Sequence, residues 1–288
     1  MSLFLSYAAT GLLQGFGFAA IAVGLTLVYG VLHLLNFATG IFALLGAYLA
    51  YFAVTSMGLD FGLAVLAAGV GLLVIGYLSA GIVVIPMKRR GASELWMMLG
   101  TVGLGLVLQE TLEVTVGDTP RSIPISLATK AISPGGVFLN DEQLVSAVVA
   151  IILITALHLG VRRTRLGKQS RAVAQNPTGA VLSGINVNRV YAAGFAVSAA
   201  VAGIAGALVL GSSPITPDAG IDLTITSFVV VIAGGLGSFW GATIMGLAIG
   251  LVQGLAAGYW SPAYAPLVGY VFLVSILLVR PRGIFSHG

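Results

Sequence analysis

Residues 223–279 read LTITSFVVVIAGGLGSFWGATIMGLAIGLVQGLAAGYWSPAYAPLVGYVFLVSILLV, a run of 57 positions without Asp, Glu, Lys or Arg. A second uncharged run covers residues 1–59. As helix, either run would extend about 85 Å, whereas the hydrocarbon core of a membrane is about 30 Å thick. Each run is therefore predicted to cross a membrane more than once, turning at Gly, Pro or Asn. Because the chain has no ten-residue alternating segments, the crossings are predicted to be helices.

The composition of the whole chain supports a membrane protein. Of its 288 residues, 58% are hydrophobic and only 8% are charged, and the mean hydropathy is +1.06. A soluble domain carries about 25% charged residues. Cytosolic enzymes, nucleic-acid-binding proteins and disordered tails are therefore excluded. We expect an all-α polytopic integral membrane protein with a single transmembrane domain over residues 1–288.

Nine apolar stretches are candidates for the crossings. They are residues 7–31, 37–56, 61–86, 95–116, 143–161, 190–211, 223–237, 240–257 and 264–279. Discontinuous or re-entrant segments are expected near 32–40 and 234–241, and either would change the count. The prediction is 8–10 transmembrane helices.

The charged residues predict the orientation. Eleven of the thirteen Lys and Arg fall in three clusters: 88–90, 162–189 and 280–282. The positive-inside rule places all three in the cytoplasm. The two other basic residues, Arg121 and Lys130, lie in the segment 117–142, which is then an extracytoplasmic loop. Asp218 and Asp222 fall in a second outer loop. The N-terminus is predicted to be outside and the C-terminus inside.

The basic segment 162–189 is the only sizeable polar stretch predicted to face the cytoplasm. Asn176 suits a helix N-cap, Pro177 the first helical position and Gly184 the position after the C-cap. These residues predict a two-turn helix over 177–183 that lies on the membrane face. Such a helix could dock a soluble partner, or the segment could be an amphipathic loop that binds anionic lipid.

Two predicted helix breaks carry polar or flexible residues. The first is 33–40, where Asn36 could cap the following helix and leave free N–H groups that attract a carboxylate. A simple tight turn is the alternative. The second is 234–241, rich in Gly, which lacks the spacing of a dinucleotide site. The chain has no G-x-x-x-x-G-K-[ST] phosphate loop, so ATP is not expected to bind to it.

Small and amide residues recur within the apolar stretches. Gly246, Gly250, Gly254 and Gly258 would line one helix face and permit close packing, either within the chain or against a second subunit. Gly11/Gly15 and Gly100/Gly103 are shorter examples. Gln14 and Gln253 are expected to form hydrogen bonds between helices.

Residue types needed for chemistry are scarce. The chain has no Cys and three scattered His, so a disulfide, a thiolate nucleophile or a metal cluster is not expected. No grouping of Ser, His and Asp suggests a catalytic site. No series of acids crosses the membrane, which argues against a proton- or sodium-coupled carrier. The sequence thus predicts a transport or channel protein without its own cofactor.

Three stretches together resemble a known family. They are GLTLVYGV…NFATG (24–40), RAVAQNP…GIN (171–186) and GGLGSFWGA (234–242), with RPRGI at 280–284. They are similar to the permease subunits of branched-chain amino acid ABC importers, of the LivH type. The likeness extends over essentially the whole chain.

This resemblance implies a permease of the bacterial inner membrane. Its partners would be a second related permease, two cytoplasmic ATP-binding subunits that hold ATP and Mg, and a periplasmic substrate-binding protein. The segment 162–189 would be the region coupled to the ATPase. Its contact residues would be Arg171, Ala174, Asn176, Pro177 and Gly184.

By the same resemblance, the substrate path would lie near the two helix breaks. Its candidate residues are His33, Asn36, Thr39, Thr226, Gly235 and Gly237. At the positions of Thr39 and Thr226 the family commonly has His and Lys, so this path is less charged. The substrate could be a branched-chain amino acid, or urea, an amide or an aromatic or other carboxylate. A stand-alone carrier or channel is the alternative outside this family.

Overall fold

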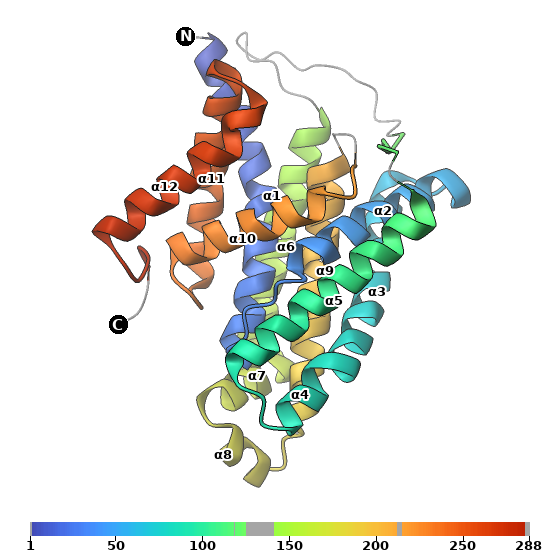
Figure 1. Cartoon of the computed structure of the whole chain (residues 1–288), viewed down its shortest axis with the longest axis vertical. Helices are drawn as coiled ribbons and strands as arrows, with labels where there is room; N and C mark the ends of the chain where they lie inside the picture. The colour runs from blue at the N-terminus through green and yellow to red at the C-terminus, as the bar shows by residue number, and fades with distance from the viewer. Residues whose placement is uncertain (1, 118, 125–140, 212–214, 286–288) are drawn as a thin grey trace.

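The computed structural model describes residues 2–117, 119–124, 141–211 and 215–285, and only the backbone at 2, 141 and 142. These residues form helices joined by short links, with one isolated bridge between Arg121 and Ile215 (Figure 1). Most of the expected outer loop 117–142 lies outside the described residues. The α-helices are α1 (Ser2–Leu32), α2 (Thr39–Met57), α3 (Phe61–Ser79), α4 (Ile85–Arg89), α5 (Glu94–Val116), α6 (Asp141–Arg163), α7 (Arg165–Gln175), α8 (Pro177–Leu182), α9 (Val187–Gly211), α10 (Ala219–Gly234), α11 (Phe239–Tyr259) and α12 (Ala265–Val279).

Eight helical segments in the described part are long and apolar enough to cross a membrane. A π-helical stretch, Ala80–Val84, joins α3 and α4 into one of them, Phe61–Arg89. A ninth apolar helix, α10, has only 16 residues. The all-α polytopic prediction is confirmed, and the count falls within the expected range. Asp222 differs from expectation, because it lies in the first turn of α10 rather than in a loop.

Both expected breaks are present. Helix α1 ends at Leu32, and His33 follows with a left-handed φ of 53°. The link 33–38 then runs inward, because the Phe37 amide donates to Thr101 Oγ1 at 3.1 Å. Thr101 is the eighth residue of α5. The start of α2 therefore lies beside a point about 10 Å from the beginning of α5. The second break separates α10 from α11 at residues 235–238.

The centre of the bundle is formed by α1 and α9. Their most apolar windows are 78% and 72% buried, whereas those of α6 and α12 are 22% and 6% buried. In Figure 1, α7 and α8 lie at the opposite end of the long axis from the start of α1. The basic residues of α4 lie at the α8 end as well, as the charge pattern predicts.

The glycine stripe of α11 packs within the chain. A methyl group added to Gly250 would overlap the Cα of Gly15, and one added to Gly254 would overlap the Cα of Gly11. Gly246 meets Ala19 in the same way. The two stripes therefore pack α1 against α11 with their backbones in contact, which resolves the alternative left open by the sequence. Gly103, in contrast, has no neighbour within 4 Å of an added Cβ.

Candidate functional site

The short helix expected on the membrane face is present as α8. Asn176 Oδ1 accepts a hydrogen bond from the Gly179 amide at 2.9 Å, and Pro177 occupies the first turn. Gly184 adopts a left-handed φ of 78°, as a residue after a C-cap commonly does. The prediction of this helix and its caps is confirmed. Helix α7 before it was not predicted, and Thr164 caps it by accepting from the Gly167 amide at 3.0 Å.

Helix α8 presents apolar side chains away from the bundle. Val181 is 58% exposed and Leu182 is 84% exposed, whereas Ala180 is buried. Sequence reasoning did not select Val181 and Leu182. The available signal was two adjacent large apolar residues inside a capped helix that is too short to cross a membrane. The two side chains form a small exposed apolar surface on a helix outside the bundle.

Arg171 has a contact that its sequence position did not suggest. Its guanidinium donates to the carbonyl oxygens of Val161 and Arg162, the latter at 3.5 Å, at the C-terminal end of α6. A cation there satisfies free carbonyls and interacts favourably with the helix dipole. Arg171 therefore fixes α7 against α6. Of the other proposed coupling residues, Ala174 is half-buried, and Asn176, Pro177 and Gly184 are exposed.

A cavity of about 420 Å³ lies where α8 approaches the end of α1 and α4. His33 and Pro177, predicted for the path and for coupling respectively, both line it. Lys88 also lines it, donates from Nζ to the Leu32 carbonyl at 3.1 Å and lies 5.0 Å from the centre of the Tyr191 ring. The end of α1, α4 and the start of α8 therefore share one polar space.

The start of α2 forms a buried polar junction. Ala38 is the N-cap residue, and its amide donates to Asn36 Oδ1 at 3.1 Å. The Gly40 amide donates to Thr224 Oγ1 of α10 at 3.1 Å. Thr39 Oγ1 donates to the Asn36 carbonyl at 2.7 Å. The expectation of free N–H groups at this helix end is wrong for the first two amides of α2, because the Thr39 amide donates to the Asn36 carbonyl and the Gly40 amide to Thr224 Oγ1. Only Asn36 Nδ2, in a residue that is 1% exposed, is buried there without a partner.

Thr226 lines a second cavity, of about 320 Å³, between α1, α10, α11 and α12. The other polar side chains around it are Gln14, Asp222 and Gln253. Sequence reasoning assigned none of these three to the path, although Gln14 and Gln253 stand out as the polar residues of apolar stretches. Their expected hydrogen bonds between helices are not seen among the described residues. They line a cavity instead.

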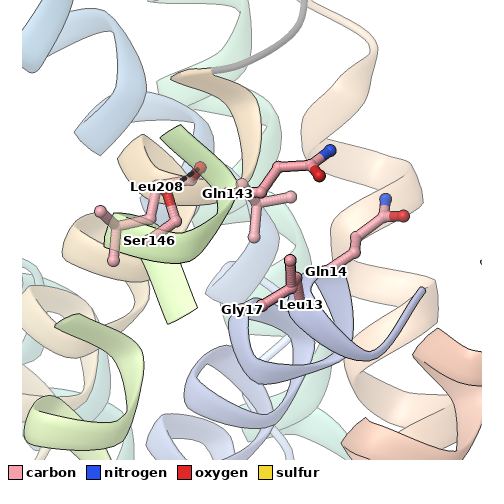
Figure 2. A pocket seen from close by; sticks show the side chains of 7 residues that line it. Leu13, Gln14, Gly17, Gln143, Ser146 and Leu208 are labelled. Carbon is pink, nitrogen blue, oxygen red and sulfur yellow. Dashed lines mark hydrogen bonds between the residues drawn. The ribbon is translucent and has the colours of Figure 1, made fainter. Parts of the chain in front are cut away.

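A smaller cavity, of about 110 Å³, adjoins this one and shares Gln14 and Val209 with it. Figure 2 shows the amide groups of Gln14 from α1 and Gln143 from α6 on the same side of this space. The Ser146 hydroxyl turns away to donate to the Leu208 carbonyl at 3.4 Å. Polar groups therefore line two connected cavities at this position.

Gly235 and Gly237 form the second break, with φ of 97° and 82°. Their surroundings differ: a methyl group on Gly283 would lie 2.6 Å from the Gly235 nitrogen, whereas Gly237 lies beside the Tyr29 ring. The six path candidates are therefore not in one place. Thr226 lines one cavity, Asn36 and Thr39 form the junction, and His33 lines the other cavity. Gly235 lies against Gly283 of the C-terminal segment, and Gly237 lies beside the Tyr29 ring.

Comparison with known proteins places this arrangement in a family. Residues 7–278 match the family described as the permease component of the branched-chain amino acid transport system. The chain is 32% identical to the high-affinity branched-chain amino acid transport system permease protein BraD of Pseudomonas aeruginosa, over 99% of this chain and 96% of that one. It is also 32% identical to the permease protein LivH of Escherichia coli K12, with the same coverage. A probable LivH of Methanocaldococcus jannaschii is 30% identical over 92% of this chain and 87% of its own. The chain thus belongs to the family of branched-chain amino acid transport permeases.

Proposed function

We propose that this permease works in the bacterial inner membrane as one of two related permeases of an ATP-driven importer. Its N-terminus would be periplasmic and its C-terminus cytoplasmic. Two cytoplasmic subunits would bind ATP and Mg, and a periplasmic binding protein would deliver the solute. The substrate class is that of the relatives, which are described as high-affinity branched-chain amino acid permeases.

The proposed path begins in the cavity lined by Thr226, here called the outer cavity. It passes the polar junction at the start of α2 and ends in the cavity lined by His33, here called the inner cavity. Helix α10 connects the first two, because Thr226 lines the outer cavity while Thr224 holds the start of α2. A solute that enters beside Thr226 would meet the closed junction. A displacement of α10 from α2 would break the bond between Thr224 and Gly40 and open the way toward His33.

The observation that carries this proposal is the shared lining of the inner cavity by Pro177 and His33. Pro177 begins α8, whose exposed Val181 and Leu182 would rest on an ATP-binding subunit. A movement of α8 driven by nucleotide would then displace one wall of the cavity directly. Such a connection converts a change at the membrane face into a change along the path.

Single cysteines test the docking of α8, because the chain has no native Cys. Leu182 on α8 and Val114 near the C-terminal end of α5 are both 84% exposed. In the assembled importer, Leu182→Cys should cross-link to the ATP-binding subunit and Val114→Cys should not. If Leu182→Cys formed no cross-link while the complex stayed intact, the proposed contact between α8 and the ATP-binding subunit would be refuted.

Leucine uptake into vesicles tests the class of transporter. We expect uptake only when the ATP-binding subunits, the binding protein and ATP are all present. Uptake by this chain alone, in vesicles without ATP, would instead establish a stand-alone carrier or channel.

A further inference from the structure

The outer cavity carries one acidic and three neutral polar side chains on its wall. Asp222 and Thr226 lie four residues apart on one face of α10, and Gln14 and Gln253 reach the same space from α1 and α11. No Lys, Arg or His is among the described residues that line it. Its volume of about 320 Å³ is at the lower end of the range for ligand sites, about 300–1,000 Å³. The cavity can therefore hold one small molecule with polar groups.

Thr226 and Gln253 are buried residues whose polar side-chain atoms have no partner in the described part of the chain. Each residue is 7% exposed. Beside Thr226 in α10, the hydroxyls of Thr224 and Ser227 donate to carbonyl oxygens one turn back, but the Thr226 hydroxyl does not. Neither Thr226 nor Gln253 has a fully enclosed polar atom without a partner. Their free polar atoms therefore open onto the cavity, and buried groups of this kind normally have a partner.

The place of the Gln253 side chain depends on a glycine in α12. Gly269 is buried, and a Cβ added to it would lie 2.6 Å from Gln253 Nε2. Glycine is less favourable than alanine inside a helix. Here the missing side chain leaves the space that the amide group of Gln253 occupies. The two helices α11 and α12 thus hold an amide donor at the cavity wall.

The rest of the wall is mainly apolar. Phe18 from α1 and Leu223 from α10 line it, and each is 6% exposed. Asp222, in contrast, is exposed, so the charge lies where the cavity opens. A ligand that satisfies the whole wall needs a cation for the carboxylate, an acceptor for the hydroxyl and amide donors, and an apolar group.

We propose that the outer cavity binds the solute as the zwitterion of an aliphatic amino acid. Gln253 Nε2 and the Thr226 hydroxyl would donate to its carboxylate, and Asp222 would accept from its ammonium group. The aliphatic side chain would lie on the apolar wall. A carboxylate without an ammonium group would be repelled by Asp222, and urea or a neutral amide would leave that charge unpaired.

This assignment rests on the proposed function, because it places the solute at the start of the proposed path. Neutral donors hold a carboxylate less tightly than Arg or Lys would. Weak binding suits a site on a transport path, which must also release what it binds. The four polar side chains therefore match both the charge pattern of an amino acid and the need to pass it on.

Ligand-induced stabilisation of the permease complex tests this site. The complex of both permeases and the ATP-binding subunits, without the binding protein, is mixed with leucine, leucinamide or isocaproate. Leucinamide lacks the carboxylate, and isocaproate lacks the ammonium group. Only leucine should raise the thermal unfolding midpoint. If either analogue raised it as much as leucine, or if leucine had no effect, the proposal would be overturned.

Two buried glutamines provide a matched pair of variants. Gln253→Leu should weaken leucine binding about tenfold or more, because it removes a hydrogen bond to a charged group. Gln109 is also 7% exposed, but it lies in α5, donates to Glu113 and does not line the cavity. Gln109→Leu should therefore leave leucine binding unchanged. Equal binding by the two variants would contradict the carboxylate site.

Gln253→Glu gives a result that a folding defect cannot imitate. The new carboxylate would repel the carboxylate of leucine and accept a hydrogen bond from the amide of leucinamide. The preference should therefore be inverted, so that leucinamide stabilises this variant and leucine does not. A Gln253→Glu variant that still prefers leucine would overturn the assignment.

Uptake by the complete importer separates this inference from the proposed function. If Gln253→Leu bound and imported leucine as the unaltered importer does, the site would be refuted while ATP-driven transport stood. Leucine binding that depends on Gln253, in an assembly that imports no leucine with ATP, would instead establish the site and refute the proposed function.

Discussion

The amide of Ile284 donates a hydrogen bond to the carbonyl oxygen of Ala233 at 3.0 Å, so the C-terminal tail closes the last turn of α10. The next amide, of Phe285, donates to Gly234 at 3.1 Å. Carbonyls at the end of a helix have no partner within it and need one from elsewhere. In this permease the segment RPRGIF supplies these partners, which explains why it adjoins the Gly-rich break although more than forty residues separate them.

Removal of residues 284–288 should therefore destabilise the second break. Two hydrogen bonds worth about 1 kcal/mol each would be lost, so the free energy of unfolding should fall by about 2 kcal/mol. The measurement is the thermal unfolding midpoint of the purified protein in detergent. Removal of 286–288 alone keeps both donors and should leave the midpoint unchanged. If the two truncations behaved alike, the tail bonds would contribute nothing to stability.

The packing of α1 against α11 predicts a strong effect of a single methyl group. Gly250→Ala would overlap the backbone of Gly15, which cannot move aside as a side chain can, and should cost about 1–3 kcal/mol. Gly103→Ala faces open space and should have no effect or a slightly stabilising one. The two variants are compared by thermal unfolding in the same detergent. Equal midpoints would show that α1 and α11 are less closely packed than the structure indicates.

Much of this fold could be predicted from the sequence because membrane helices are specified locally. Uncharged runs, glycine positions and caps such as Asn176 each depend on neighbouring residues. The glycine stripe was also predicted, but its partner was not. Whether Gly250 packs against Gly15 or against another subunit depends on how segments distant in sequence come together. The residues around each glycine do not specify its partner.

The candidate site was harder to predict for the same reason. Asn36 was expected to cap α2, but Ala38 takes that position, and Thr101 and Thr224 supply hydroxyls from helices 64 and 184 residues away along the chain. No local pattern indicates such long-range partners. Asp222 and Gln14 gather with Thr226 only when α1 and α10 are assembled. Residues in regular apolar helices were therefore located well, and polar residues that act across helices were not.

The junction at α2 predicts a requirement for one hydroxyl. Thr224→Val would leave the buried Gly40 amide without an acceptor, which should cost about 1–3 kcal/mol of stability and lower leucine uptake. Thr224→Ser retains the hydroxyl and should restore most of both. Stability is measured by thermal unfolding and uptake in cells that express the complete importer. A Val variant as stable as the Ser variant would contradict the role of this bond.

The outer cavity predicts a role for the carboxylate of Asp222. An amino acid carries an ammonium group, and a charged hydrogen bond to it is worth about 1.5–3 kcal/mol, so Asp222→Asn should lower leucine uptake about tenfold or more. Asp218→Asn is the control, because Asp218 precedes α10 and does not line the cavity. Uptake is measured at equal membrane levels of the two variants. An equal loss in both would indicate a general effect of acidic residues at the outer face.

Finally, the cap of α8 should matter for coupling rather than for the stability of the bundle. Asn176→Ala removes the acceptor for the Gly179 amide, which should destabilise this two-turn helix by about 1 kcal/mol. Asn186→Ala removes the equivalent bond to Arg189 at the start of α9, whose 25 residues are held by packing in the centre of the bundle. ATP hydrolysis per leucine transported should therefore rise for Asn176→Ala and stay constant for Asn186→Ala. An unchanged ratio for both would mean that the folded state of α8 does not control the transfer of movement, and that the contact between Pro177 and the inner cavity serves packing alone.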